Sequence, residues 1–349
     1  MRARQGEEAT TVSDTKTEVH RKGTQGSVSP EVLRQIYVTA VRSRVLDERI
    51  WVLNRQGRAP FWISGMGHEV FQSAVGTAVD SSKDWLAPYY RDLALTLAFG
   101  MSPKDHFLSA LAKADDPNSG GRQMPAHFGN REHNIVSTGS PVATQMLHAA
   151  GVALGMKLKH TDALAVTSLG EGSTSGGDFH EALNFAAVHK LPVLFLVENN
   201  GYAISVPLDK QMPTSHVSDR ARAYGIPGVS VDGGDAVACY EAAMTAVERA
   251  RKGEGPTLIE GMVARLTSHS SDDDERRYRP AEEIESVHQA DCLVRLERYL
   301  LLQGVLTEAD LTSIRDAAVK EIDVDMEAAE QAPLPEPETA LRYVYAEEA

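Results

Sequence analysis

The sequence predicts an α/β fold, a parallel sheet flanked by helices on both faces, with a helical C-terminal part. The prediction rests on the middle of the chain, where short apolar runs alternate with segments of helical periodicity. We expect strands at 163–169, 192–198 and 257–264, and helices at 178–190 and 235–252. Strands that alternate with helices usually lie parallel, because each helix returns the chain to the same end of the sheet.

The ordered part of the chain is expected to begin near Ser29. This serine can cap a helix, and Pro30 fits the first helical turn, where its missing N–H is not needed. The residues before it are polar and lack the apolar core of a signal peptide. We therefore predict a disordered tail at 1–28 and one α/β domain at 29–349.

The part of the chain after Pro280 is predicted to be helical, with Thr307 as a helix cap. Residues 332–338, APLPEPE, are expected to be extended because they contain three prolines.

Composition excludes several classes of protein. The net charge of −14 argues against binding to nucleic acid and to anionic lipid. No apolar run approaches the roughly 20 residues that a membrane-spanning helix needs. The two cysteines, Cys239 and Cys292, are far apart and lack metal-ligand spacing, which favours a reducing compartment. We expect a cytoplasmic protein.

The stretch GEGSTSGG, residues 170–177, follows a predicted strand and opens a predicted helix. Backbone N–H groups at such a helix start favour phosphate oxygens. A Walker loop would need a lysine, which is absent. A dinucleotide-binding turn is a closer alternative, because three of its glycines are spaced G-x-G-x-x-x-G and Glu198 stands where a ribose-binding acid would lie. An ordinary tight turn explains the glycines equally well.

A second motif favours a metal site. Asn199 and Asn200 follow the GEG after 26 intervening residues, so Glu171 and Asn200 should lie at the carboxyl ends of successive strands. A carboxylate repels a diphosphate unless a cation lies between them. Magnesium accepts carboxylate, amide and phosphate oxygens together, so we predict a magnesium ion and a diphosphate here.

Further motifs share this context. They are RQGRAPFW (55–62), PYYRD (88–92), GRQMPAHFG (121–129), TGSPVATQ (138–145), the GEG-to-NNGYAIS block (170–205) and SHSSDDDERRYR (268–279). Together they resemble the α subunits of the thiamine diphosphate-dependent first component of 2-oxo acid dehydrogenase complexes. The likeness covers about residues 30–345 and is nearest to the branched-chain type.

This resemblance implies thiamine diphosphate and Mg²⁺ as cofactors, with Glu171, Asn200 and the backbone carbonyl of Tyr202 as metal ligands. The residues expected around the cofactor are Tyr89, Tyr90, Arg91, Ser140, Pro141, Val142, Gly170, Glu171, Gly172, Ser173, Thr174, Ser175, Gly176, Asn200, Gly201, Tyr202, Ala203, Ile204 and His269. Without the resemblance, Arg91 would be interpreted as a surface ion pair with Asp92, and His269 as an exposed histidine.

The resemblance also assigns roles around the substrate. His269 is expected to act as an acid or hydrogen-bond donor, and the adjacent Ser270 matches a serine that is phosphorylated in animal relatives. The substrate side is expected to involve Phe61, Tyr90, Met124, Pro125, Ala126, His127 and Ser140. A structural histidine is the alternative for His127. Glu198 departs from the animal branched-chain enzyme, which has an arginine there, so that diphosphate contact is absent.

The implied activity is the oxidative decarboxylation of branched-chain 2-oxo acids, with acyl transfer to the lipoyl group of the complex's second component. This is the activity of 3-methyl-2-oxobutanoate dehydrogenase (2-methylpropanoyl-transferring). The family's second subunit supplies the glutamate that activates the aminopyrimidine, and none can be assigned here, so an α2β2 heterotetramer is expected. The alternatives are a pyruvate or acetoin dehydrogenase α subunit, an NAD-dependent dehydrogenase and a non-catalytic scaffold subunit.

Overall fold

The computed structural model describes residues 28–342, 344 and 345. The predicted tail at 1–28 lies outside the described residues, apart from Val28. Helix α1 (Pro30–Arg55) begins as the sequence predicts. Pro30 lies in its first turn, and the Ser29 side chain accepts a hydrogen bond from the backbone N–H of Val32 at 3.3 Å.

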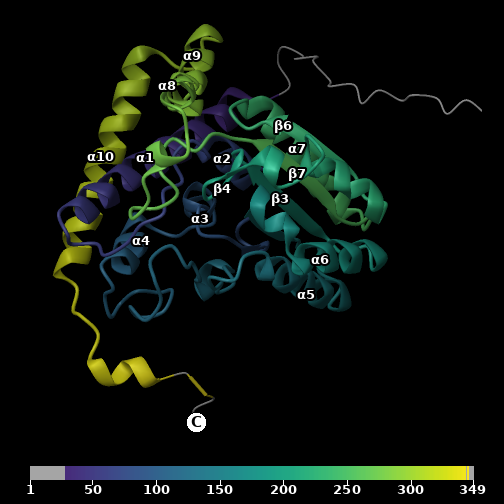
Figure 1. The fold of residues 1–349 in the computed structure, drawn as a ribbon, viewed down its shortest axis with the longest axis horizontal. Helices are drawn as coiled ribbons and strands as arrows, with labels where there is room; N and C mark the ends of the chain where they lie inside the picture. The colour runs from purple at the N-terminus through teal and green to yellow at the C-terminus, as the bar shows by residue number, and fades with distance from the viewer. Residues whose placement is uncertain (1–27, 343, 346–349) are drawn as a thin grey trace, which may run out of the picture.

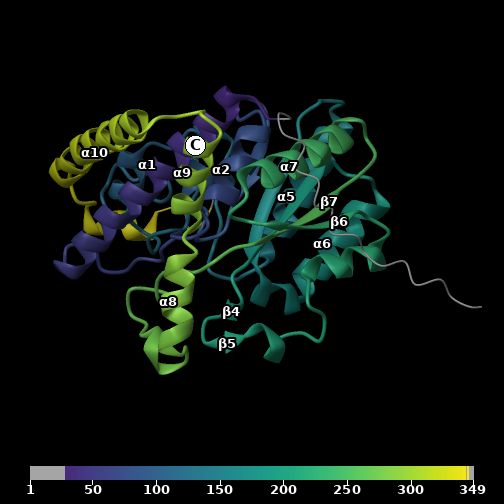
Figure 2. The same cartoon turned by 90° about the horizontal axis from the view of Figure 1, so that it is seen from above.

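The main sheet has five parallel strands in the order β1-β2-β3-β7-β6 (Figures 1 and 2). Their bounds are β1 Trp85–Ala87, β2 Ala165–Gly170, β3 Val193–Asn199, β6 Gly228–Asp232 and β7 Thr257–Met262. The predicted strands correspond to β2, β3 and β7, and the parallel sheet is confirmed. The sequence did not predict β1, which has only three residues, or β6, whose residues are mostly exposed.

Helices cover both faces of this sheet, as the sequence predicts. The predicted helices are α6 (Gly177–Val188) and α7 (Ala236–Arg251), which lie on opposite sides of the strands (Figure 2). On the side of α6 lies α5 (Thr144–Leu158), and on the side of α7 lies α2 (Glu69–Ala78). An apolar cluster lies on each face of the sheet, and alternate side chains of β3 enter one or the other. Every residue of β3 is therefore buried.

The C-terminal part is helical, as predicted, and comprises α8 (Ala281–Gln289), α9 (Cys292–Leu302) and α10 (Glu308–Gln331). Thr307 is confirmed as a cap, because it and Asp310 exchange hydrogen bonds with each other's backbone N–H groups. Helix α10 packs against α1, and the pairs Arg42–Glu321 and Arg49–Asp323, both at 2.6 Å, join the two helices.

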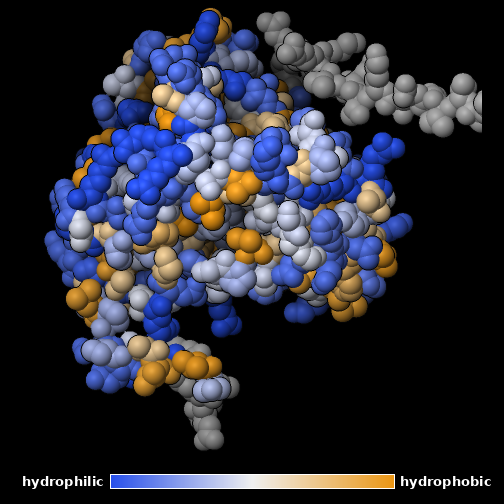
Figure 3. Space-filling model, viewed as in Figure 1, coloured by the Kyte–Doolittle hydropathy of each residue, from blue (hydrophilic) through white to orange (hydrophobic). Residues whose placement is uncertain are grey.

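The segment after α10 is extended as far as Glu336 and then forms a short 3₁₀ helix, Pro337–Leu341. The prediction of extended chain through 338 is therefore wrong at its end, because Pro337 fits the first position of a helix. This segment projects from the body and leaves Leu334 and Leu341 exposed (Figures 1 and 3). Among the described residues, no helix is long and apolar enough to cross a membrane.

Two short helices complete the part of the fold that leads to the site. They are α3 (Leu93–Ala98) and α4 (Pro103–Ala110), and α3 begins directly after the predicted motif PYYRD. The side chain of Gln72 on α2 accepts a hydrogen bond from the backbone N–H of Ala94 at 3.0 Å. Helix α2 therefore holds the start of α3, and with it the preceding Arg91, against the sheet.

Candidate active site

Glu171 and Asn200 meet at the carboxyl edge of the sheet, as the spacing predicts. Strands β2 and β3 are parallel neighbours with Gly170 opposite Glu198, so the residues that follow both strands emerge side by side. The backbone N–H of Asn200 donates to the Glu171 carboxylate at 3.3 Å. Glu171 is 2% exposed, and its burial raises the pKa of this carboxyl group.

The glycines of the motif allow this close approach. Glu171–Ser175 form a short 3₁₀ helix between β2 and α6. A Cβ atom on Gly172 would lie 2.4 Å from the Cβ of Ala203, so any larger residue would push the two loops apart. Gly201 has a φ of +83°, which glycine adopts without strain. The tight turn lets the Asn200 side chain accept a hydrogen bond from the backbone N–H of Tyr202 at 3.2 Å.

The other residues of the glycine loop have structural roles or face outward. Thr174 is buried, and its hydroxyl donates to the backbone carbonyl of Glu171 at 2.6 Å. Ser175 and Gly176 are exposed, whereas Gly170 and Ser173 are half-buried. The structure therefore brings the start of the loop to the sheet edge and turns its end toward α6.

Arg91 and His269 lie together beneath this edge. Arg91 is 2% exposed and donates through Nη1 to the carbonyl of Ser64 at 2.7 Å. Its Nη2 lies 2.9 Å from the carbonyl oxygen of His269 and 3.0 Å from the Nδ1 of the same residue. The alternative interpretation of Arg91, a surface ion pair with Asp92, is wrong because the guanidinium is buried and points to His269.

The contact with Arg91 fixes the protonation of His269. A guanidinium can only donate, so Nδ1 of His269 accepts and the ring proton lies on Nε2. Burial, and then the charges of Arg91 and Arg265, lower the pKa of His269 to about 4. At neutral pH, His269 is thus an uncharged imidazole whose Nε2–H can donate, and the interpretation as an exposed histidine is wrong.

Arg265 is a site residue that sequence reasoning missed. It is 1% exposed, donates to the carbonyl of Ile204 at 3.0 Å and to the hydroxyl of Tyr278 at 2.8 Å, and leaves Nε without a partner among the described residues. Burial and the nearby charge of Arg91 lower the pKa of its guanidinium. The available signal was its place after β7, because Glu171 and Asn200 follow β2 and β3 in the same way.

Glu198 lies deeper and is fully engaged by protein groups. Its carboxylate lies 2.5 Å from Nδ1 of His68, 3.0 Å from the hydroxyl of Tyr89 and 3.0 Å from Nε2 of Gln72. Burial raises the pKa of Glu198 and lowers that of His68 to about 3. A ribose-binding acid would need a free oxygen facing outward, so this geometry argues against the dinucleotide alternative.

Most residues expected near the substrate lie on the loop before α5, whereas Phe61 follows α1 and Tyr90 follows β1. His127 lies 2.7 Å from the Ser140 hydroxyl through Nε2 and 3.0 Å from the Met124 carbonyl through Nδ1. Met124 is 51% exposed and Val142 49%. Pro141 is also exposed, Phe61 and Tyr90 are half-buried, and Pro125 and Ala126 are buried.

Two sets of residues are distinguished below. We call Arg91, Glu171, Asn200, Arg265 and His269 the inner group, and Met124, His127, Ser140 and Val142 the outer group.

Comparison with known proteins agrees with this arrangement. The family model of the dehydrogenase E1 component matches residues 37–338. This chain belongs to that family. It is 50% identical over 311 residues to the 2-oxoisovalerate dehydrogenase subunit alpha of Bacillus subtilis, covering 89% of this chain and 94% of that protein.

More distant E1 relatives carry two different substrate names. The 2-oxoisovalerate dehydrogenase subunit alpha 2 of Arabidopsis thaliana is 36% identical over 91% of this chain and 67% of its own length. The pyruvate dehydrogenase E1 component subunit alpha of Staphylococcus epidermidis is also 36% identical, over 87% of this chain and 79% of its own length. At this level of identity the two substrate types are equally similar to the present E1 chain.

The inner group of this E1 chain fits a diphosphate held with a hard cation. Two buried guanidinium groups, Arg91 and Arg265, form no ion pair with any described carboxylate. Two buried nitrogen atoms at this site, Nε of Arg265 and Nε2 of His68, have no hydrogen-bond partner among the described residues. The described residues contain no cluster of three or more His, Cys, Asp or Glu side chains, so a metal ion would take one carboxylate, an amide and backbone oxygens.

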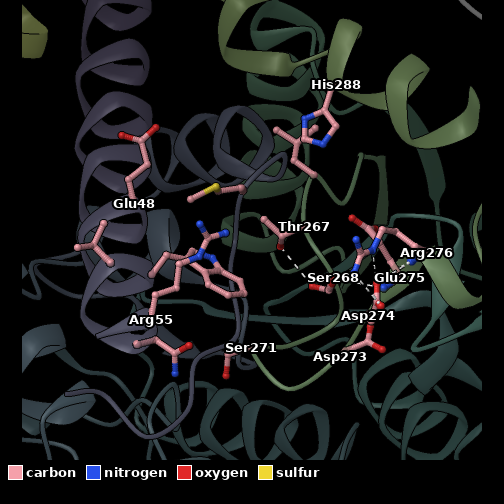
Figure 4. Close-up of a pocket in the computed structure, with 15 residues that line it drawn as sticks. Glu48, Arg55, Thr267, Ser268, Ser271, Asp273, Asp274, Glu275, Arg276 and His288 are labelled. Carbon is pink, nitrogen blue, oxygen red and sulfur yellow. Dashed lines mark hydrogen bonds and ion pairs between the residues drawn. The ribbon is translucent and has the colours of Figure 1, made fainter. Parts of the chain in front are cut away.

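A separate cavity of about 770 Å³ lies between α1 and the His269 loop, by which we mean residues 263–280 between β7 and α8 (Figure 4). Glu48, Trp51 and Arg55 line it from α1, and Ser268 and Ser271 line it from the loop. Neither His269 nor Arg91 borders it. In this E1 chain the His269 loop therefore separates the cavity from the inner group, and it has open space on its other side.

Proposed function

We propose that this chain is the α subunit of a branched-chain 2-oxo acid dehydrogenase and holds the diphosphate end of thiamine diphosphate. Dehydrogenase E1 components depend on thiamine diphosphate, and this chain is 50% identical to a 2-oxoisovalerate dehydrogenase α subunit. The observation that carries the proposal is the meeting of Glu171 and Asn200 at the sheet edge, together with two buried arginines that form no ion pair with a described carboxylate.

The metal would be Mg²⁺. Its protein ligands would be the Glu171 carboxylate, the Asn200 side-chain oxygen and the backbone carbonyl of Tyr202, a set of hard oxygen donors that suits this ion. Arg91 and Arg265 would balance the remaining negative charge of the diphosphate, because both are held in place by neutral carbonyl or hydroxyl acceptors.

His269 would donate its Nε2–H to an anionic group. Its Nδ1 is already occupied by Arg91, so the donor position is fixed without any rearrangement of the ring. Thiamine diphosphate, when bound, supplies the nucleophilic carbon that adds to the keto group and the electron sink for loss of carbon dioxide. The chain itself binds the diphosphate, orients it and keeps water from the inner group.

A partner subunit would complete the outer group. Met124 and Val142 are about half exposed, and so are Ile204, directly after strand β4 (Tyr202–Ala203), and Val206 in its partner strand β5 (Val206–Pro207). Apolar side chains lie at the surface in the middle of the face that carries β4 (Figure 3). We propose a β subunit in an α2β2 assembly, and a lipoyl-bearing acyltransferase component that takes the acyl group. A cytoplasmic location remains a prediction from the sequence.

The proposed substrate is a branched-chain acid such as 3-methyl-2-oxobutanoate. Phe61 and Tyr90 are half-buried and Val142 is exposed, so these side chains remain available to bound an aliphatic group. Each extra methylene in a fitting apolar pocket is worth roughly 1–3 kcal/mol, so a preference over pyruvate of about a hundredfold is expected. Pyruvate is the second candidate, since pyruvate dehydrogenase α subunits are 36% identical to this chain.

The test is co-expression with a candidate β subunit, followed by kcat/KM for both acids and by calorimetric titration of thiamine diphosphate with and without Mg²⁺. The proposal expects magnesium-dependent binding and the larger kcat/KM for the branched acid. An equal or larger value for pyruvate would make the chain a pyruvate dehydrogenase α subunit. Binding of NAD in place of thiamine diphosphate would reject the cofactor assignment itself.

A further inference from the structure

Asp47 is a buried carboxylate on α1 whose contacts all lead to one loop. It is 1% exposed and forms no ion pair with a described cation. One oxygen accepts from Nε1 of Trp62 at 2.8 Å. The other accepts from the hydroxyl of Ser64 and the backbone N–H of Gly65, each at 2.8 Å. Three donors within four consecutive residues thus converge on one side chain, and we call residues 62–65 the tethered loop.

The tethered loop is in turn bonded to the inner group. The carbonyl of Ser64 accepts from Arg91 at 2.7 Å. Trp62 and Ser271 exchange two hydrogen bonds: the Trp62 N–H donates to the Ser271 hydroxyl at 3.1 Å, and the Ser271 N–H donates to the Trp62 carbonyl at 2.9 Å. Ser271 lies two residues after His269. A displacement of the tethered loop would therefore move both the guanidinium of Arg91 and the backbone that carries His269.

Elsewhere, the space between these loops and α1 is open. The cavity of about 770 Å³ is bordered by Met66, which follows the tethered loop, and by Thr267, Ser268 and Ser271 of the His269 loop (Figure 4). Space on that side leaves room for both loops to shift. The hydrogen bonds of Asp47 attach the tethered loop to α1 beside this cavity.

A carboxylate is a costly choice for a purely structural contact. Burial raises the pKa of Asp47 to about 6, which shows that the charged form is disfavoured at this position. It is nevertheless ionised at neutral pH, and only the ionised carboxylate accepts all three donors. An asparagine would present an amide N–H₂ to one of them, and an apolar side chain would leave all three unpaired.

We propose that Asp47 is a positioning residue of the active site, which fixes the tethered loop and through it the places of Arg91 and His269. The predicted effect of Asp47 on cofactor binding and activity rests on the proposed function. Its mechanical part, the link from Asp47 to the His269 loop, is independent of that function. Nothing in the chain's sequence motifs singles out Asp47, because its three partners lie 15 to 18 residues away.

The experiment uses Asp47→Asn in the full chain, alone and co-expressed with the β subunit. Arg276 and Arg277 are exposed in the His269 loop, so trypsin reports how well that loop is held. We expect faster cleavage there in the variant, and a rise of about tenfold in the KM for thiamine diphosphate with a smaller change in kcat at saturating cofactor. Wild-type cleavage and wild-type cofactor KM would overturn the inference.

A matched control separates position from general stability. Asp84 is also a fully buried carboxylate, at the amino end of the sheet, where it accepts from the backbone of Leu164 at 3.0 Å and pairs with Arg251 at 2.6 Å. Asp84→Asn should destabilise the fold without changing the cofactor KM or the cleavage of the His269 loop. If Asp84→Asn reproduces the Asp47→Asn pattern, the effect is loss of stability and the inference fails.

A second change provides rescue. In Asp47→Asn the new amide faces the indole N–H of Trp62 if its oxygen keeps Ser64 and Gly65. Adding Trp62→Phe removes that donor, so the double variant should recover at least threefold of the lost cofactor affinity, by the order of one hydrogen bond. No recovery would overturn the inference. If Asp47→Asn does not fold, Ser64→Ala, which removes a single donor, should show the same pattern at smaller size, and a wild-type pattern in it would overturn the inference.

The outcomes remain distinguishable from failure of the proposed function. If the wild-type assembly decarboxylates no 2-oxo acid, the proposed function fails, while faster tryptic cleavage in Asp47→Asn still supports the mechanical link. If the wild type is active and Asp47→Asn matches it in both measurements, the proposed function stands and the role of Asp47 is rejected.

Discussion

Three members of the inner group are placed by the sheet, whereas the outer group lies on a loop with one side open. Glu171, Asn200 and Arg265 each follow a strand of the same sheet, and the sheet register fixes where those strands end. The outer group follows no strand, and its loop contains two alanines with positive φ, Ala126 at +64° and Ala143 at +74°. If the proposed function holds, the chain alone builds the diphosphate-binding half of the site and a partner subunit completes the other half.

The largest expected effect comes from removing the one carboxylate of the inner group. Glu171→Ala should weaken magnesium-dependent binding of thiamine diphosphate by more than about a hundredfold, because a direct metal ligand is lost. Calorimetric titration of the assembled enzyme measures this. Glu181→Ala, at an exposed position on the following helix, is the control and should bind normally. Unchanged affinity in Glu171→Ala would show that the inner group holds no metal.

The second prediction tests whether the two halves separate. The chain purified without a β subunit should show no decarboxylation above background, since no described residue of the outer group supplies a second acid. The same preparation should still bind inorganic pyrophosphate with Mg²⁺, because its arginines are already in place. Turnover by the lone chain would mean that the catalytic acid lies within it, and would remove the contrast between the two groups.

The third prediction compares one residue from each group. Arg265→Gln should raise the KM for thiamine diphosphate by about tenfold to a hundredfold, because a charge-assisted contact is worth roughly 1.5–3 kcal/mol. His127→Ala should leave the cofactor KM within about twofold and lower kcat/KM for the 2-oxo acid, since it removes one hydrogen bond worth roughly 1 kcal/mol. Steady-state kinetics of the assembled enzyme measure both the KM for thiamine diphosphate and kcat/KM for the 2-oxo acid. Equal effects on cofactor and acid in both variants would contradict the division.

The last prediction concerns acid stability beneath the outer group. Burial lowers the pKa of His106 from 6.5 to about 4, and this ring packs edge-on against Phe128, beside His127, at 5.3 Å between ring centroids. Because the folded state binds fewer protons than the unfolded state between these values, stability should fall as the pH drops from about 6.5 to 4, by up to about 3 kcal/mol from this group.

Urea unfolding of wild type and His106→Gln at pH 7.5 and 4.5 measures that contribution. The difference between the two proteins should shrink or reverse at the lower pH. A pH-independent difference would show that His106 is already protonated or is not desolvated in the folded chain. Asp47 and Glu198 have raised pKa values and act with the opposite sign, so only the comparison between variants isolates His106.

The sequence predicted the parts of the fold whose burial leaves a local pattern. Continuous apolar runs identified β2, β3 and β7, and helical periodicity identified α6 and α7. Helix α5 was not predicted, because it is rich in alanine and glycine and has no marked polar face. Strand β6 was missed because its residues are mostly exposed, so its position depends on pairing with β7 and not on its own composition.

The residues of the site were likewise predictable only where a local sequence pattern marks them. The meeting of Glu171 and Asn200 followed from strand spacing and electrostatics, whereas the contact between Arg91 and His269 could be expected only from family resemblance. Arg265 and Asp47 were missed for a common reason. Each acts through contacts between segments that are distant along the chain, and no short motif records such contacts.

The packing of α10 on α1 has a consequence for how the chain is made. A ribosome releases α1 long before α10, which begins about 250 residues later. During that interval α2 can already pack on α1, but the face of α1 that packs on α10 is uncovered and the arginines that later pair with α10 face solvent. That face of α1 is therefore open to aggregation and proteolysis until α10 has been made. A chaperone that binds this face of α1 until α10 has been synthesised would protect the chain.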